Sequence, residues 1–317
     1  MWENYLNDFK SYILFEHSLS TNTFEAYLSD CNKFFKFMQE NFPDITPHTT
    51  ELKHITKFIT QLDKEAGNSE EEKLLKASSQ NRIISGVKAF FKFLLMTDVI
   101  ENNPCLLIES KRLEQRIPIV LSHQEIQRML NVIDKSTYHG FRDSLIIEIL
   151  YACGLRISEL LNMKLGDVYY HHEYIKVLGK GNKERLVPIG EKALMLLEYY
   201  IKNHRSKLAK IDPKCKDYIF LNRRGRKLTR QYVFQTIKTF AQEAGIKKNI
   251  HPHTLRHSFA TALIEGGANL IVVKEMMGHA SVVSTQIYTH LDTAHLRETL
   301  MLYHPHYQEL NKKNYNR

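Results

Sequence analysis

The sequence is poor in cysteine and has no long apolar run, and both absences narrow what the chain can be. Its four cysteines lie far apart and form no Cys-x-x-Cys pair, which excludes a zinc ribbon and disfavours structural disulfides. We therefore expect a reducing, cytoplasmic compartment. No stretch of about 18 apolar residues occurs, so we expect no transmembrane helix and no membrane partner. The charged N-terminal segment also lacks the pattern of a signal peptide.

Acidic residues are scarce in the C-terminal two thirds of the chain. Residues 1–110 contain 11 Lys and Arg against 16 Asp and Glu, whereas residues 111–317 contain 33 against 19. The whole chain has a net charge of +9. A basic excess of this kind indicates a polyanionic partner, and its distribution places the electrostatic attraction in the C-terminal part. A length of 317 residues predicts two domains, at roughly 100–200 residues each.

The N-terminal part, residues 1–108, shows apolar and aromatic residues at helical spacing and predicts a small bundle of four helices. The third helix is expected over Leu52–Leu62. The fourth is expected over about Ser78–Thr97. Asn103-Pro104 should end it, because proline disfavours the helical conformation of the residue before it.

Residues 109–118 are highly charged, lack a core pattern and end in proline, which predicts a linker between the two domains. Its three positive charges suit a strap along a phosphate backbone. They suit a solvated connector equally well.

The second domain, residues 119–317, is predicted to be mostly helical with a small antiparallel sheet, so the fold class is mainly α. Ser122 and Glu125 form a capping-box pattern. An apolar helix is expected over Ser144–Ala152, ended by Gly154. Three short strands are expected over Val168–Tyr170, Tyr174–Leu178 and Arg185–Ile189, the last two joined by a glycine-rich hairpin turn.

One candidate site lies in the segment His251–His257. His253 and Arg256 are three residues apart at a predicted helix start, so they share a face where anions are favoured. Taken alone, the pair is ordinary for a surface helix. No carboxylate or cysteine set accompanies the three histidines, so we expect no metal.

Three further segments carry reactive side chains. Arg156 follows Gly154 at a helix start, with Glu159 one turn later, a spacing that a surface salt bridge also gives. Lys180 lies between two glycines in the hairpin turn, where an exposed lysine is common. Tyr288 follows His279 by nine residues, and a lone tyrosine is usually a core or interface residue.

Taken together and in this order, the residues resemble the tyrosine recombinase (phage integrase) family. The set consists of Arg156, Lys180, His253, Arg256, His279 and Tyr288. The surrounding words GLRISELL, VLGKGNKERLVPIG, HTLRHSFAT and MMGHASVVSTQIYTH are similar to those of the family. The resemblance covers nearly the whole chain, including the N-terminal core-binding (SAM-like) domain. It is strongest to the Xer branch, whose members resolve chromosome dimers, although Tyr303 stands where that branch often has histidine.

The resemblance implies cleavage and rejoining of double-stranded DNA through a 3′-phosphotyrosine on Tyr288. Arg156, Arg256 and His279 would stabilise the phosphorane, His253 would be the base or proton relay, and Lys180 the acid. Glu159 is expected to position Arg156 or the active-site loop. No cofactor is implied. The family acts as a tetramer on DNA, alone or with a paralogous recombinase, and in the Xer branch a DNA translocase is a further expected partner.

Other functions remain open on the sequence alone. Within the family these are the integrase or transposase of a mobile element and a DNA invertase. Outside it stand a type IB topoisomerase and a non-catalytic DNA-binding protein. The C-terminal segment, residues 292–317, offers Leu296, Leu300 and Leu302 either to a neighbouring subunit or to its own domain.

If Lys180 protonates the departing 5′ oxygen, the Lys180→Ala variant should cleave DNA about 10²–10⁴ times more slowly, the range typical of a lost general acid. A substrate with a 5′-phosphorothiolate leaving group needs no such proton and should restore the rate. The measurement is single-turnover cleavage of both substrates. Equal defects on the two substrates would rule out Lys180 as the acid.

Overall fold

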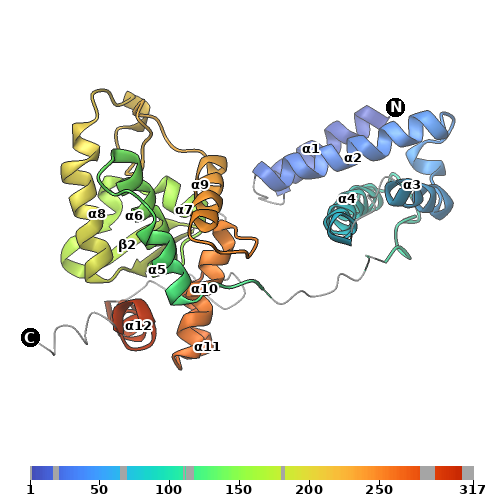
Figure 1. The fold of residues 1–317 in the computed structure, drawn as a ribbon. Helices are drawn as coiled ribbons and strands as arrows, with labels where there is room; N and C mark the ends of the chain where they lie inside the picture. Colours follow the sequence, from blue (N-terminus) through green and yellow to red (C-terminus); the bar gives the residue numbers. More distant parts are fainter. Residues whose placement is uncertain are drawn as a thin grey trace, which may run out of the picture. The chain divides into compact units, whose positions relative to one another are not determined.

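The chain forms two compact units, Met1–Arg116 and Ile117–Arg317. The computed structural model describes residues 2–16, 21–64, 70–109, 111, 118–179, 183–278 and 290–308. Both units are mainly helical, and the second contains one small antiparallel sheet (Figure 1). The predicted fold class is confirmed. In the described part of the chain, no helix combines the length and apolarity needed to cross a bilayer.

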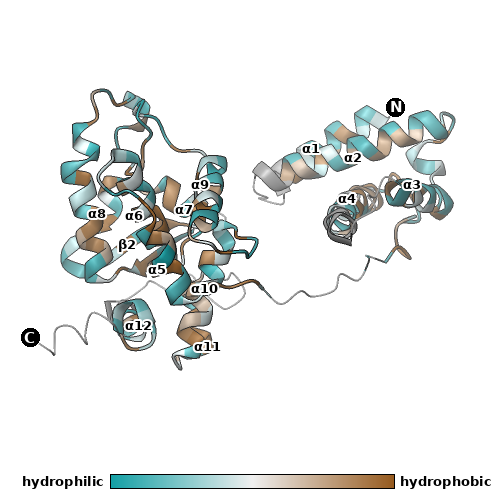
Figure 2. Ribbon diagram, viewed as in Figure 1, coloured by the Kyte–Doolittle hydropathy of each residue, from teal (hydrophilic) through white to brown (hydrophobic). Residues whose placement is uncertain are grey.

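The N-terminal unit is a helical bundle around an aromatic core. Its helices are α1 (Trp2–Glu16), α2 (Thr21–Asn41), α3 (Leu52–Lys64) and α4 (Glu70–Met96), with a 3₁₀ turn at Pro47–Thr49. Phe34 and Phe91 are fully buried, and their rings meet edge to face at 5.8 Å. Apolar residues of the helices face the inside of the bundle (Figure 2). Aromatic burial of this density supplies most of the driving force for folding the unit.

Helix α4 begins earlier than predicted and ends within one residue of the predicted end, by another cause. It begins at Glu70 rather than Ser78, because the sequence EEEKLLKA consists of good helix formers even though it lacks a clear apolar face. It ends at Met96, before Asn103-Pro104. Asp98 adopts a left-handed conformation (φ 55°), and the Val99 amide donates to the Leu94 carbonyl over 2.9 Å. A left-handed C-cap, rather than proline, therefore ends this helix.

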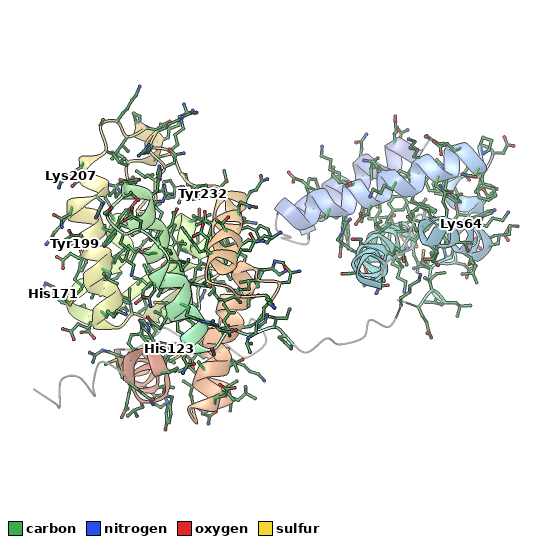
Figure 3. All side chains as sticks on the ribbon, in the orientation of Figure 1. Lys64, His123, His171, Tyr199, Lys207 and Tyr232 are labelled. Atoms are coloured by element: carbon green, nitrogen blue, oxygen red, sulfur yellow. The ribbon has the colours of Figure 1, made fainter. Side chains whose placement is uncertain are left out.

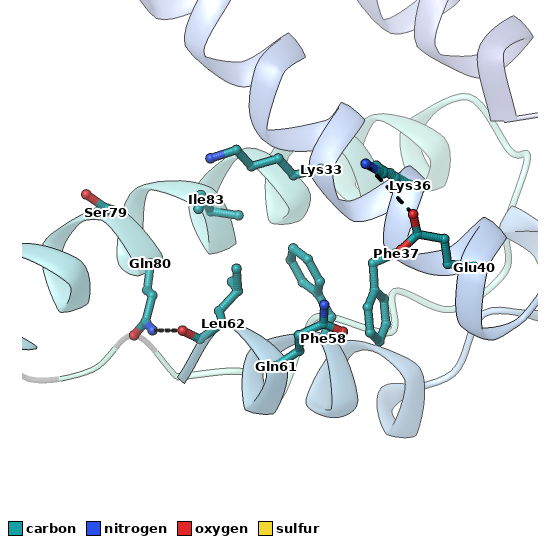
Figure 4. A pocket seen from close by; sticks show the side chains of 10 residues that line it. All are labelled: Lys33, Lys36, Phe37, Glu40, Phe58, Gln61, Leu62, Ser79, Gln80 and Ile83. Atoms are coloured by element: carbon teal, nitrogen blue, oxygen red, sulfur yellow. Dashed lines mark hydrogen bonds and ion pairs between the residues drawn. The ribbon is translucent and has the colours of Figure 1, made fainter. Parts of the chain in front are cut away.

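A pocket of ≈ 520 Å³ opens among α2, α3 and α4 (Figure 4). Its apolar lining includes Phe37, Phe58 and Ile83, and Lys33 also lines it. It contains none of the candidate catalytic residues.

The C-terminal unit combines eight helices with the sheet in its described residues. The helices are α5 (His123–Asn131), α6 (Tyr138–Cys153), α7 (Ile157–Asn162), α8 (Glu191–Asn203), α9 (Arg230–Glu243), α10 (Pro252–Glu265), α11 (Leu270–Met276) and α12 (His290–Tyr303). Short 3₁₀ turns occupy Leu165–Asp167, Tyr170–His172, Arg205–Lys207 and Pro213–Cys215. The strands β1 (Val168–Tyr169), β2 (Tyr174–Leu178) and β3 (Glu184–Pro188) pair in the order β1-β2-β3, all antiparallel.

Helix α6 is the centre of this unit. It begins at Tyr138 rather than Ser144, because the Thr137 side chain caps it by accepting from the Gly140 amide, and every residue from Arg142 to Cys153 is buried. Arg142 is paired with Asp143, and both contact the hydroxyl of Tyr232 on α9, which is labelled in Figure 3. The buried charges are thus neutralised by each other.

The predicted capping box is also present in the C-terminal unit. The Ser122 side chain accepts from the Glu125 amide over 3.2 Å, and the Glu125 carboxylate accepts from the Ser122 amide over 2.8 Å.

The described part of the C-terminal segment packs on its own unit. Leu296 and Leu300 lie in the core, whereas Leu302 is exposed. Beyond α12, the Tyr307 hydroxyl donates to the Ala152 carbonyl over 3.1 Å, and His306 lies 2.8 Å from Glu148. Of the two expected contacts for this segment, the structure shows the one with its own domain as far as residue 308.

The left-handed residue Asp98 gives a stability prediction. Asp98→Gly should raise the free energy of unfolding by about 0.5–1 kcal/mol, because glycine adopts the left-handed conformation with little strain. The greater flexibility of glycine in the unfolded chain offsets part of this stabilisation. Asp98→Ala, which keeps the strain, should not stabilise the protein. Urea denaturation of the two variants measures the difference. Equal stabilisation by both would show that backbone strain at residue 98 is not the cause.

Candidate active site

Arg156 owes its position to a tight reversal between α6 and α7. Gly154 ends α6 with φ 60°, and a Cβ atom there would lie 2.3 Å from the Phe259 ring, so only glycine is accommodated. Two residues later, Arg156 is the N-cap residue of α7. The reversal places the start of α7 beside α10, which carries Phe259 and packs against α6.

The Glu159 carboxylate is the centre of the site. It is 1% exposed, and it accepts from the Arg156 backbone amide and side chain, both over 2.8 Å. The Arg185 guanidinium donates to both of its oxygens, over 2.6 and 2.9 Å. Burial alone would raise the pKa of Glu159, but the hydrogen bonds and charges of Arg185 and Arg156 outweigh it and lower the pKa. Glu159 is therefore ionised at neutral pH.

Arg256 of α10 is the second arginine of the predicted clamp. Its Nη1 donates to the Gly154 carbonyl over 2.6 Å and its Nη2 donates to the Met277 carbonyl. Its Nη1 also lies 3.8 Å from Glu159 Oε2. Burial and the neighbouring charge of Arg156 lower the pKa of Arg256 to about 10, which still leaves it charged at neutral pH.

The residues before His279 are held by both arginines. The Gly278 carbonyl accepts from Arg156 Nη2 over 3.1 Å, next to the Met277 carbonyl that serves Arg256. Gly278 has φ 61°, and a Cβ atom on it would lie 3.0 Å from Arg185 Nε. The chain that leads to His279 is therefore fixed directly against the arginine cluster.

His253 lies at the exposed start of α10, one turn before Arg256. Partial desolvation, followed by the charges of Arg256, His257 and Arg156, lowers the pKa of His253 below its usual value. The ring is consequently neutral at neutral pH, and its nitrogen lone pair can accept a proton. Across the described ranges, no three His, Cys, Asp or Glu side chains form a metal-binding group.

The structure thus brings together Arg156, Glu159, His253 and Arg256. Lys180, His279 and Tyr288 lie outside the described residues. The flanks of two of them reach the cluster. Gly179 donates to the Lys183 carbonyl over 2.7 Å at the base of the hairpin, and a Cβ atom on Gly179 would lie 3.9 Å from Glu159 Oε1.

Arg185 was missed as a site residue by the sequence analysis, which placed it only in a strand. Its side chain is 7% exposed and shares the buried face of β3 with Val187. That alternation is the signal that was present, because an arginine on a buried strand face needs a carboxylate partner. The identity of the partner, 26 residues earlier, follows only from the fold.

The cluster has the chemistry of an oxyanion site. Three guanidinium groups surround one carboxylate, which leaves an excess of positive charge. Arg156 is the most accessible of the three, with 29% of its side chain exposed. Guanidinium groups bind phosphate oxygens through forked, charge-assisted hydrogen bonds. The geometry therefore suits a phosphodiester whose oxygens gain negative charge during attack.

Two family models match the chain. The phage integrase family model matches residues 120–295, and the phage integrase N-terminal SAM-like domain model matches residues 6–97. Among similar curated proteins is tyrosine recombinase XerD of Listeria monocytogenes serotype 4b (strain F2365), 38% identical over 301 residues, which cover 95% of this chain and 98% of that protein. XerD of Chlorobaculum tepidum (strain ATCC 49652 / DSM 12025 / NBRC 103806 / TLS) is 38% identical over 308 residues, 96% of this chain and 97% of that protein.

Solved structures share the fold. A XerH site-specific recombinase bound to palindromic difH substrate matches with a TM-score of 0.65 and 24% identity, over 88% of this chain and 79% of that one. The Tn1549 transposon integrase in complex with circular intermediate DNA matches with a TM-score of 0.67 and 19% identity, over 92% and 98%.

The lowered pKa of His253 gives a pH prediction. NMR titration should give His253 a pKa below the usual value of about 6.5. Arg156→Gln should raise the pKa of His253, because one repelling charge is lost. Arg205→Gln, a distant charge removal, should leave it unchanged. At pH values between the lowered pKa of His253 and its usual pKa, the unfolded chain binds more protons than the folded protein. His253 therefore makes the stability fall as the pH drops through this range. A ring that is protonated at pH 7 would contradict the expected role of His253 as a base.

Proposed function

The chain belongs to the phage integrase family of tyrosine recombinases, and we propose that it cuts and rejoins DNA at specific sites through a 3′-phosphotyrosine on Tyr288. The observation that carries the proposal is the pair Arg156 and Arg256, held around the ionised Glu159 carboxylate. This pair is the described part of a phosphate clamp. Arg156 also binds the carbonyl of Gly278, one residue before His279, and this contact supports the assignment of His279 to the same site.

The clamp supplies the electrostatic part of the mechanism. Attack on a phosphodiester adds negative charge to the non-bridging oxygens, and preorganised donors stabilise that charge without reorganising. Each such donor is worth about 3 kcal/mol by analogy with oxyanion holes. Arg156 and Arg256 are fixed through Glu159 and the carbonyls of Gly154, Met277 and Gly278. Their orientation therefore does not depend on the arrival of DNA.

The remaining roles concern proton transfer. The Tyr288 oxygen attacks the phosphorus, forms the phosphotyrosine bond and releases the 5′ oxygen of the next nucleotide. Tyrosine has a pKa of about 10 and needs a base at neutral pH. The neutral His253 ring is suited to accept that proton or relay it. Lys180 protonates the leaving oxygen, and His279 adds a donor to the phosphorane. Attack by another strand's 5′-OH reverses the step, so no ATP or metal is needed.

The proposed cellular role is Xer-type recombination that resolves chromosome dimers in the cytoplasm. The XerD relatives support this role because their identity extends over nearly the full length of both chains. The DNA partner is a duplex recombination site, drawn by the basic C-terminal part of the chain. On this DNA the protein forms a tetramer, with itself or with a paralogous recombinase, and a DNA translocase is the further partner.

A two-site plasmid assay separates this role from the related activities. A Xer-type resolvase converts a plasmid with two sites into two circles, whereas a type IB topoisomerase relaxes supercoils on a plasmid without any site. Relaxation without recombination would overturn the proposed role while leaving the phosphotyrosine chemistry in place.

The nucleophile itself is tested by replacement. Tyr288→Phe should abolish covalent attachment to a nicked suicide substrate and leave DNA binding unchanged, because only the attacking oxygen is removed. Tyr199→Phe removes the hydroxyl of an exposed tyrosine on α8, labelled in Figure 3, and should form the adduct normally. Denaturing gels score the adduct. An adduct formed by the Tyr288→Phe variant would contradict the assignment.

A further inference from the structure

Arg185 contacts the centre of the site although none of the proposed chemical steps uses it. We propose that Arg185 is a positioning residue: it fixes the Glu159 carboxylate and, through it, holds Arg156 in the orientation that grips the scissile phosphate. The inference rests on the proposed function, because it assigns a task to Arg185 within the same reaction.

The contact between Arg185 and Glu159 is a two-pronged one. Arg185 Nη1 donates to Glu159 Oε1 and Nη2 donates to Oε2, over 2.6 and 2.9 Å. This fork fixes both the position and the plane of the carboxylate. Each oxygen then has one further donor from Arg156: its Nη1 on Oε1 and its backbone amide on Oε2. The plane of Glu159 therefore sets the orientation of Arg156.

Burial makes this arrangement sensitive to the loss of Arg185. Glu159 is 1% exposed, so water cannot replace a missing donor. Without the fork, the carboxylate is left to Arg156 and to Arg256, whose Nη1 lies 3.8 Å away. A turn of the carboxylate toward Arg256 would draw it away from Arg156. A lysine at position 185 keeps the charge, but a single ammonium group cannot hold both oxygens in plane.

Arg185 also connects two other parts of the site. It lies in β3 opposite Val177 of β2, close to the hairpin base, where a Cβ atom on Gly179 would be 3.6 Å from its Nη1. On its other side, a Cβ atom on Gly278 would be 3.0 Å from its Nε. The same side chain thus binds Glu159 of α7 and lies beside Gly179 and Gly278, the residues before Lys180 and His279.

The first test is single-turnover cleavage by Arg185→Lys. We expect cleavage to slow by about 10²-fold, the loss that a 1 Å misplacement can produce. DNA affinity should change little, because the scissile phosphate is one of many phosphate contacts. Arg185→Lys combined with Glu159→Gln should be no slower than the slower single variant, because both changes break one connection. Wild-type cleavage by Arg185→Lys, or fully multiplicative defects, would overturn the proposal.

Modified substrates identify the step that Arg185 serves. A methylphosphonate at the scissile position removes one negative charge and reduces the need for the clamp, so the defect of Arg185→Lys should shrink on it. A 5′-phosphorothiolate relieves only the need for the acid, so the defect should persist. Rescue by the phosphorothiolate alone would assign Arg185 to the Lys180 hairpin and overturn its role in the clamp. Equal defects of Arg185→Lys on all three substrates would show that the Arg185–Glu159 ion pair has only a structural role, and would overturn the proposal.

Arg205→Lys is the matched control. Arg205 is also 7% exposed in the same unit, but it donates to the backbone carbonyls of Tyr218 and Lys216 rather than to Glu159. The Arg205→Lys variant should cleave every substrate as fast as the wild type does. A defect equal to that of Arg185→Lys would attribute the loss to any buried arginine and contradict the proposal.

Hydrogen exchange tests the positioning claim without catalysis. The Arg156 amide is bonded to Glu159 and should exchange faster in Arg185→Lys, while it stays protected in the wild type and in Arg205→Lys. If the wild type forms no adduct on Tyr288, the proposed function fails, and exchange at Arg156 still decides whether Arg185 orders Glu159. An unchanged Arg156 amide in Arg185→Lys would overturn the inference.

Discussion

The proposed active site depends on one buried carboxylate. Glu159 is shared by Arg156 and Arg185 at hydrogen-bonding distance and lies 3.8 Å from Arg256. Three guanidinium groups so close together repel one another, and the carboxylate that lies among them offsets this repulsion. A buried charge is tolerated when it is paired and hydrogen-bonded. Glu159 therefore permits a concentration of positive charge that a phosphodiester can exploit.

Backbone groups supply the hydrogen-bond acceptors that hold the arginines in addition to Glu159. Backbone carbonyls of Gly154, Met277 and Gly278 accept further hydrogen bonds from Arg156 and Arg256, so these two arginines are preorganised before DNA binds. Two glycines with positive φ make these approaches feasible, Gly154 against Phe259 and Gly278 against Arg185. The site is thus an assembly of α6, α7, β3 and α10 with the chain after α11. None of these elements forms it alone.

Sequence patterns predicted the elements whose signals are local. Gly154 and the α7 start that follows it are readable from sequence, as are the β2–β3 hairpin and the capping box at Ser122. The start of helix α4 was predicted eight residues too late, because its first turns have propensity without periodicity. Its end was predicted within one residue, but the backbone of Asp98 rather than proline sets it. Arg185 could not be paired with Glu159, because no local rule joins residues 26 apart in different elements. Lys180, His279 and Tyr288 remain predictions that rest on the family pattern.

In the proposed mechanism, the arginines around Glu159 bind the scissile phosphate. A crystal structure of the protein on its recombination site, with vanadate at the scissile position to imitate the phosphorane, tests it directly. We predict that Arg156 and Arg256 donate to the equatorial vanadate oxygens, with Glu159 still bound to Arg156 and Arg185 and the Tyr288 oxygen in an apical position. Vanadate held by other side chains, or a Glu159 carboxylate turned away from Arg156, would contradict it.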